Sequence, residues 1–361
     1  MDAVARETAA LVAARGARLV TAEEASHWSL ESHTFHFELM KRLHRSGGFT
    51  AFSSERLGRL DAFLMNAWLQ GRVDLTLDQL YDRLPFGGLG TYRWMEYFKR
   101  TRRPFALVGL EIDDVASYAD PRLLPLVRSL CSPEFARAVT FTEAIDRGAT
   151  PKTDDDATIK GILDATPRAR GGWRKHRLDA WFANIRACLA QHGNLFINGF
   201  HLSRGAVPGE GRDLLLAHRI PGAMSVGVRS FHAQRVLFRI TDEVLRERGW
   251  TRAGAVRAFE RDLKADGYAR YGHYARESVV ADVHEHSEPN AEAERLYGGG
   301  NGFALVESAR IPPGVRLPGT WGASMFPVPG KRATEAAHPA RHDCVVFIPR
   351  STLHRRGGMR M

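Results

Sequence analysis

The sequence predicts an α/β protein with a largely parallel central sheet, flanking helices and a mostly helical insertion. Three observations support this fold class. Short apolar runs recur along the chain, as is typical of strands buried on both faces of a sheet. Amphipathic segments that end in glycine alternate with these runs. One long stretch, from about 115 to 190, contains no strand-like run.

Seven apolar runs predict the strands of the sheet. In chain order they are RLVTA (18–22), FTAFSS (49–54), FALVGL (105–110), NLFING (194–199), AMSVGV (223–228), FALVES (303–308) and CVVFIP (344–349). Each is short enough for a strand and too short for a buried helix of usual length.

The segments between these runs carry apolar residues at helical spacing. After the first strand, Phe35, Leu39 and Leu43 recur every four residues, and Gly47-Gly48 is a natural helix stop. RLDAFLMNAWLQG and RLDAWFANIRACLAQHG repeat this arrangement and end at Gly71 and Gly193. The N-terminal run MDAVARETAALVAARGARLV is also typical of an amphipathic helix. The order strand, helix, strand favours parallel pairing.

The stretch from 115 to 190 predicts a helical insertion or cap within one domain that spans 1–361. It contains YADPRLLPLVRSL and the acidic segment KTDDDATIKGILD. Towards the C-terminus, the glycine- and proline-rich segments 296–302 and 310–322 predict loops.

Composition restricts the class of partner. The formal net charge is +10, but basic clusters alternate with acidic segments, and no helix-turn-helix, zinc-finger or RNA-binding motif occurs. We therefore expect a small-molecule substrate and no nucleic acid. No apolar run approaches the roughly 18 residues of a membrane span, and the N-terminus lacks the apolar core of a secretory signal. We expect a cytoplasmic protein that does not bind a membrane, and the sequence leaves the oligomeric state open.

Titratable residues follow four of the predicted strands. The first strand leads to Glu24 and His27, the second to Glu55, the third to Glu111 and the fourth to His201. The carboxyl ends of strands line the ligand crevice of open α/β sheets, so these side chains are expected to converge. Carboxylates and imidazoles together supply general acid–base chemistry. Glu24, His27, Glu55 and His201 could alternatively bind a divalent metal.

Several short motifs resemble the erythromycin esterase family. They are EASH (24–27), GGFTAFSSE (47–55), MNAWLQG (65–71), TYRWMEYFKR (91–100), GLE (109–111), NGFH (198–201) and HDCVVFIPRSTLHR (342–355). The interval of 28 residues from His27 to Glu55 also agrees with the family spacing. The resemblance covers most of the chain.

This resemblance implies hydrolysis of an ester or lactone by activated water, without an acyl-enzyme. We expect no cofactor, and the sequence leaves a divalent metal open. His27 matches the general base, and Glu24 and Glu55 match residues that position the base and the water. His201 matches the second histidine of the later motif and His36 a position in the first helix that assists catalysis. Asn198 and Glu111 are candidate substrate-binding residues.

Three positions depart from the family pattern. Asn198 replaces a histidine and cannot carry a proton. Glu23 replaces a glycine. His36 replaces an arginine, which removes a fixed positive charge that protonated histidine would restore in part. These departures predict a different substrate, in secondary metabolism or antibiotic modification. They leave open a biosynthetic acyltransferase, a dehydrating cyclase or a metal-dependent hydrolase on the same fold.

Two other motifs carry less weight. AMSVG (223–227) resembles a relaxed nucleophile elbow around Ser225, but the strand begins at this motif instead of ending there, so a serine triad is disfavoured. His33 and His36 lie three apart on one helix, which would suit a metal, but the HExxH spacing is missing and we favour packing against the sheet.

Overall fold

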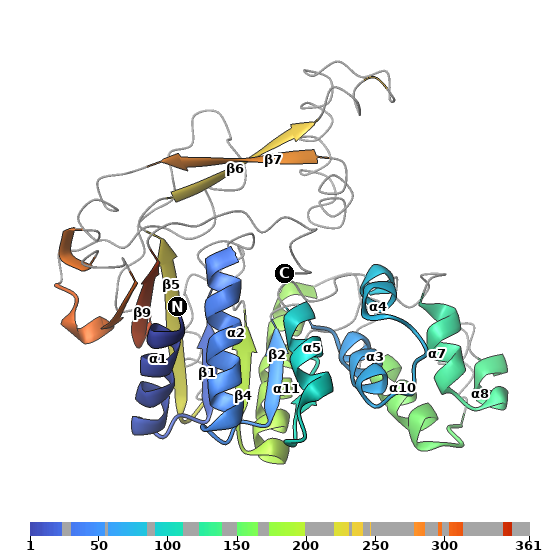
Figure 1. Cartoon of the computed structure of the whole chain (residues 1–361). Coiled ribbons are helices and arrows are strands. Elements are labelled where there is room, and N and C mark those ends of the chain that lie inside the picture. Colours follow the sequence, from blue (N-terminus) through green and yellow to red (C-terminus); the bar gives the residue numbers. More distant parts are fainter. Residues whose placement is uncertain are drawn as a thin grey trace.

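The computed structural model describes residues 1–23, 30–54, 57–84, 91–110, 123–138, 150–164, 173–198, 220–230, 233–240, 246, 278–285, 295–297, 303–312 and 342–348. Their main feature is a seven-stranded sheet with helices on both faces (Figure 1).

All seven predicted strands are present in this sheet. They are β1 (Leu19–Ala22), β2 (Ala51–Ser54), β3 (Ala106–Leu107), β4 (Leu195–Asn198), β5 (Ala223–Ser230), β8 (Ala304–Glu307) and β9 (Cys344–Ile348). Their order is β3-β2-β4-β1-β5-β9-β8, and every neighbouring pair is parallel except β8 with β9. The predicted α/β class with a largely parallel sheet is confirmed.

The chain reverses its direction of winding beside β1. Strands β2, β3 and β4 lie on one side of β1, whereas β5, β9 and β8 lie on the other. In open α/β sheets, the carboxyl ends of the strands at such a reversal form the usual ligand crevice. The topology therefore directs attention to the ends of β1, β4 and β5.

Alternating residues of each strand enter two different cores. In β1, Val20 and Ala22 belong to the larger core, with helices α1 (Asp2–Ala14), α2 (Leu30–Arg45), α3 (Arg59–Leu69) and α5 (Tyr92–Arg100). Leu19 belongs to the smaller core on the other face, which helix α11 (Trp173–His192) covers. Because both faces are covered, the strands are mostly apolar.

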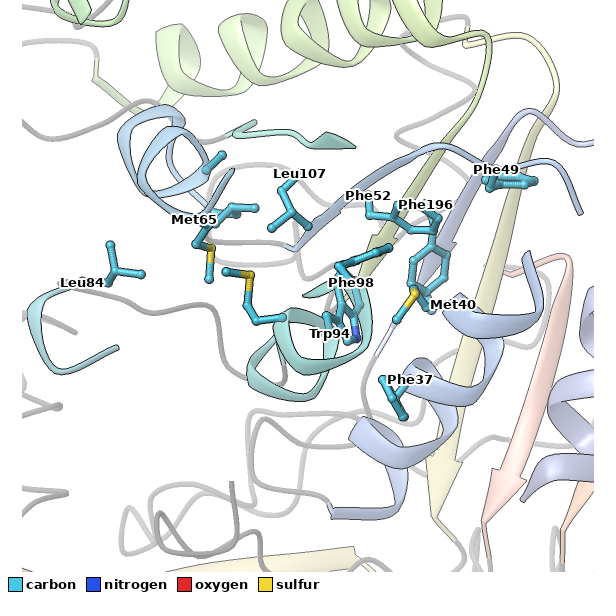
Figure 2. Packing of buried hydrophobic residues seen from close by; sticks show 14 of the residues in the cluster. Phe37, Met40, Phe49, Phe52, Met65, Leu84, Trp94, Phe98, Leu107 and Phe196 are labelled. Atoms are coloured by element: carbon cyan, nitrogen blue, oxygen red, sulfur yellow. The ribbon is translucent and has the colours of Figure 1, made fainter. Parts of the chain in front are cut away.

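Aromatic side chains fill the larger core between β2, β4 and α5 (Figure 2). The ring of Phe52 lies 5.2 Å from that of Phe98, and the ring of Trp94 lies 5.8 Å from that of Phe196, centroid to centroid. These contacts fix α5 on the sheet.

Left-handed glycines end three of the predicted segments. Gly48 follows α2 with φ +70°, Gly71 follows α3 with φ +75°, and Gly193 follows α11 with φ +76°. A residue with a Cβ is strained at such angles, which explains why glycine stops the helix at these positions.

The predicted helical insertion is also confirmed. Between β3 and β4, the described residues form α7 (Leu124–Leu130), α8 (Pro133–Ala138), α10 (Asp154–Asp164) and α11, and no strand. A shorter helix, α4 (Leu77–Arg83), precedes α5. Since α11 packs its Trp181, Phe182 and Ile185 on the sheet, the last part of the predicted insertion is a layer of the α/β core.

The third strand is shorter than the predicted run. Gly109 lies so close to α3 that a Cβ on it would be 2.3 Å from both the Cα of Arg59 and the carbonyl oxygen of Gly58. The Leu110 amide then donates to the carbonyl of Leu57 instead of to β2. The chain thus leaves the sheet to pack beside the start of α3.

One pair of strands was not predicted. The strands β6 (Ala233–Ile240) and β7 (Ser278–Glu285) form a separate antiparallel sheet of eight residue pairs.

In the part of the chain that the structure describes, no helix is long and apolar enough to cross a bilayer.

Candidate active site

The central strands end level with one another. Asn198, the last residue of β4, pairs with Ala22 at the end of β1 and with Ser54 at the end of β2. From these ends the chain continues to the segments that carry Glu24 and His27, and Glu55. These segments therefore begin at the same end of the sheet, where the carboxyl ends of β1, β2 and β4 lie side by side.

The structure describes only two of the seven predicted site residues, His36 and Asn198. The other five are His27, Glu24, Glu55, His201 and Glu111, and they lie outside the described residues. Their roles stay predictions, as does their convergence.

Asn198 is buried, with 1% of its surface exposed. Its Oδ1 atom has no hydrogen-bond partner among the described residues. The same holds for the hydroxyl of Ser54, its register partner, which is also buried. A buried polar group without a partner is costly, so a polar pair of this kind at strand ends is a candidate for binding substrate or water. Ser54 was not among the predicted residues.

His36 lies in α2 and is fully buried. Its Nε2 atom is 3.2 Å from the backbone carbonyl oxygen of Glu23, to which a protonated Nε2 donates. This contact holds the end of β1 from the side of the larger core. His36 thus has a demonstrated contact with the strand end, and its predicted part in catalysis stays a prediction.

A buried cluster of charged and polar side chains surrounds Glu23. We call it the Glu23 cluster, and it comprises Glu23, Ser225, Arg229 and His342. The Nη1 and Nη2 atoms of Arg229 lie 3.3 and 3.2 Å from Oε2 of Glu23, and Nε2 of His342 lies 2.7 Å from the same oxygen. All four residues are almost completely buried. Removing one charge of such a pair leaves the other uncompensated, at a cost of about 3–5 kcal/mol.

The cluster joins segments that are distant in the sequence. Glu23 follows β1, Ser225 and Arg229 belong to β5, and His342 precedes β9. Within β5, Ser225, Gly227 and Arg229 alternate with Val226 and Val228, which enter the larger core. The first three therefore share the opposite face, where the ring of His342 lies over Gly227 between the two polar side chains.

Sequence reasoning did not identify this cluster. Glu23 was recognised only as a departure from a glycine, Arg229 and His342 were not singled out, and Ser225 was weighed as a nucleophile and disfavoured. Ser225 is the third residue of β5, so the motif does begin a strand. The available signal was an arginine inside an apolar strand, since a buried arginine requires a carboxylate partner.

The described residues contain no group of three or more histidine, cysteine or carboxylate side chains that could hold a metal ion. The alternative metal ligands Glu24, His27, Glu55 and His201 lie in the segments that are not described. The metal-dependent alternative is therefore untested.

Comparisons with known proteins bear on the fold. Neither models of protein families nor curated proteins match the chain. Among solved structures, a Bacillus cereus protein is similar with a TM-score of 0.56 at 12% identity, covering 94% of this chain and 90% of that one. A variant of the erythromycin esterase EreC in its open conformation is similar with a TM-score of 0.52 at 13% identity, covering 94% and 92%.

A third similar structure is a succinoglycan biosynthesis protein, with a TM-score of 0.53 at 13% identity, covering 93% of this chain and 88% of that one. These likenesses span nearly the whole of each chain. This protein therefore has an erythromycin esterase-like fold, as its motifs predicted, in a divergent sequence.

Proposed function

We propose that this protein is an esterase-type hydrolase that cleaves an ester or lactone of a small molecule with activated water. The observation that carries the proposal is the level ending of β1, β2 and β4, because the chain leaves these ends into the segments that hold Glu24, His27 and Glu55. The likeness of the fold to an erythromycin esterase supports the same reaction class.

In the proposed reaction, His27 accepts a proton from water while the water oxygen attacks the carbonyl carbon. The tetrahedral intermediate then collapses, and the departing alkoxide takes the proton from His27, which yields an acid and an alcohol. Glu24 and Glu55 orient His27 and the water. His201 and His36 stabilise developing charge, and Asn198 and Glu111 bind the substrate.

Asn198 and Ser54 extend this proposal. Their buried oxygen atoms, which lack partners among the described residues, suit hydrogen bonds to a polar substrate group or to the attacking water. An asparagine is neutral at every working pH, so this position would bind without transferring a proton. This favours a substrate other than that of the esterase EreC, in secondary metabolism or antibiotic modification.

The test is hydrolysis of a panel of p-nitrophenyl esters and macrolactones by the wild type and by His27→Ala. General base catalysis contributes about 10²–10⁴-fold, so His27→Ala should lose activity by that factor and keep its circular dichroism spectrum. His192→Ala, in the last turn of α11, is the matched control and should keep full activity. Retention of most of the turnover by His27→Ala would refute the assignment.

Isotope labelling separates the reaction classes. In water enriched in heavy oxygen, hydrolysis places one heavy oxygen atom in the acid product, and no acyl-enzyme accumulates. Acyl transfer to an added alcohol or amine, or a product lighter by one water, would instead identify an acyltransferase or a dehydrating cyclase. Loss of activity on chelation, restored by a divalent metal, would identify the metal-dependent alternative.

A further inference from the structure

The backbone amide, the backbone carbonyl and the carboxylate of Glu23 each have a hydrogen-bond partner. Its amide donates to the carbonyl of Val226 in β5 at 2.8 Å, and its carbonyl accepts from His36 in α2 at 3.2 Å. Its carboxylate takes Arg229 and His342. Three separate elements therefore fix one residue, which directly precedes the segment that carries Glu24 and His27.

His342 lies within hydrogen-bond distance of Glu23. Its Nε2 atom is 2.7 Å from Oε2, and a ring with its proton on Nε2 donates to this carboxylate. On the other side of the ring, Nδ1 lies 2.9 Å from the hydroxyl of Ser225, which is a hydrogen-bond distance. Nη2 of Arg229 lies 3.0 Å from Nε2 of the same ring and 3.2 Å from Oε2 of Glu23, so the three side chains are in mutual contact.

The resulting chain of Ser225, His342 and Glu23 has the composition of a catalytic triad but not its setting. Ser225 lies within β5, paired with Thr21 of β1, and only 1% of its surface is exposed. A nucleophilic serine must reach a substrate carbonyl, which a side chain enclosed between strands and a histidine ring does not. The geometry suits a rigid support better than a nucleophile.

We propose that Arg229, His342 and Ser225 are positioning residues, which act through Glu23 to fix the start of the segment carrying Glu24 and His27. This inference rests on the proposed function in so far as it concerns turnover. The Arg229 guanidinium and the His342 ring both contact Oε2 of the Glu23 carboxylate, and the Ser225 hydroxyl holds the ring in place. Asp343 completes the support, since its carboxylate accepts from the Ser225 amide at 2.9 Å.

The first variant is Glu23→Gln, which keeps the shape of the side chain and removes its charge. A displacement of about 1 Å at a catalytic group can cost roughly 10²-fold in rate, so kcat on the best p-nitrophenyl ester should fall by about that factor while KM changes little. The double variant Glu23→Gln with Arg229→Met removes both charges of the ion pair. It therefore leaves no buried charge without its partner, which would destabilise the fold. It should fold, and kcat should stay low.

The matched control is Arg42→Gln. Arg42 also forms a close ion pair with a carboxylate, Asp2, at 2.6 Å, but the pair lies at the surface. This variant should keep wild-type kcat and KM.

Hydrogen–deuterium exchange of the full-length protein tests the inference without relying on turnover. Peptides covering 24–29 should exchange roughly tenfold faster in the double variant than in the wild type, while peptides from α3 stay unchanged. Unchanged exchange over 24–29 in the folded double variant would overturn the inference. If the wild type has no esterase activity but exchange responds as expected, the proposed function fails and the positioning role stands.

A serine-directed fluorophosphonate distinguishes support from nucleophile. We expect no labelling of Ser225. Labelling of Ser225 that disappears in His342→Gln would overturn the positioning role and identify a working triad.

Discussion

The imidazole ring of His342 lies directly against the backbone of Gly227. A Cβ at Gly227 would be 2.5 Å from Cδ2 and 2.9 Å from Cγ of the ring. Only a glycine allows the ring to reach both Glu23 and Ser225. The glycine within β5 is therefore explained by a residue 115 positions away in the sequence.

Gly227→Ala should destabilise the protein by about 1–3 kcal/mol, because the added methyl group forces the ring or the strand to move. Chemical denaturation measures the change. The control is Gly161→Ala in α10, where a Cβ meets no atom within 4 Å and should stabilise by about 0.5–1 kcal/mol. Equal effects of the two substitutions would show that the His342 contact is absent.

The side chain of Asn194 should stabilise the folded protein, because it links the start of β4 to the segment that precedes β2. Its Oδ1 accepts from the Thr50 amide at 2.7 Å, and its Nδ2 donates to the Gly48 carbonyl at 3.0 Å. Asn194→Ala leaves both groups without this partner and should cost about 1–3 kcal/mol in the free energy of unfolding. Asn194→Asp retains the acceptor for Thr50 and should cost less, and the reverse ranking would contradict this role.

His44 should make stability depend on pH in mildly acidic solution. Burial is the main cause that lowers its pKa below the usual 6.5, against a hydrogen bond to the Pro104 carbonyl, and the charges of Arg103 and Arg45 lower it further. Nε2 donates to Pro104 and Nδ1 accepts from the Tyr97 hydroxyl, so the native state holds the neutral ring.

The direction of this pH dependence follows from the number of protons that the folded and unfolded states bind. Below about pH 6.5 the unfolded chain binds a proton at His44 that the native state excludes, so stability falls as the pH is lowered towards the native pKa. His44→Gln should be less stable at neutral pH but should lose this part of the pH dependence. Thermal unfolding between pH 7.5 and pH 5 measures it, and an unchanged slope in the variant would refute the assignment.

The cysteines should resist thiol reagents in the folded protein. All three are free, and burial raises the pKa of the Cys188 and Cys344 thiols to about 12. Burial and the nearby carboxylates of Asp156 and Asp155 raise the pKa of Cys131 to about 12 as well. Since the thiolate is the reactive form, reaction at neutral pH should be slow before unfolding and rapid afterwards. Fast reaction of one thiol in the native protein would contradict its burial.

Most helices and strands of the main sheet could be predicted, because the sequence patterns that indicate them extend over only a few neighbouring residues. The strands are continuous apolar runs, and the glycines after α2, α3 and α11 adopt the left-handed angles that end a helix. The strands β6 and β7 escaped prediction because neither is a continuous apolar run: Arg235 and Arg239 interrupt the first, and Asp282 interrupts the second.

The sequence by itself determined the seven strands of the main sheet and the helices between them, and it predicted chemistry at the strand ends, which stays a prediction. Only the tertiary structure decided that β4 lies between β1 and β2, so that Asn198 meets Ser54 and Ala22. It also brought Arg229 and His342 to Glu23 across 206 and 319 residues of sequence. The physical reason is that apolar periodicity acts over a few residues, whereas a buried carboxylate finds its partners only after the sheet has formed around it.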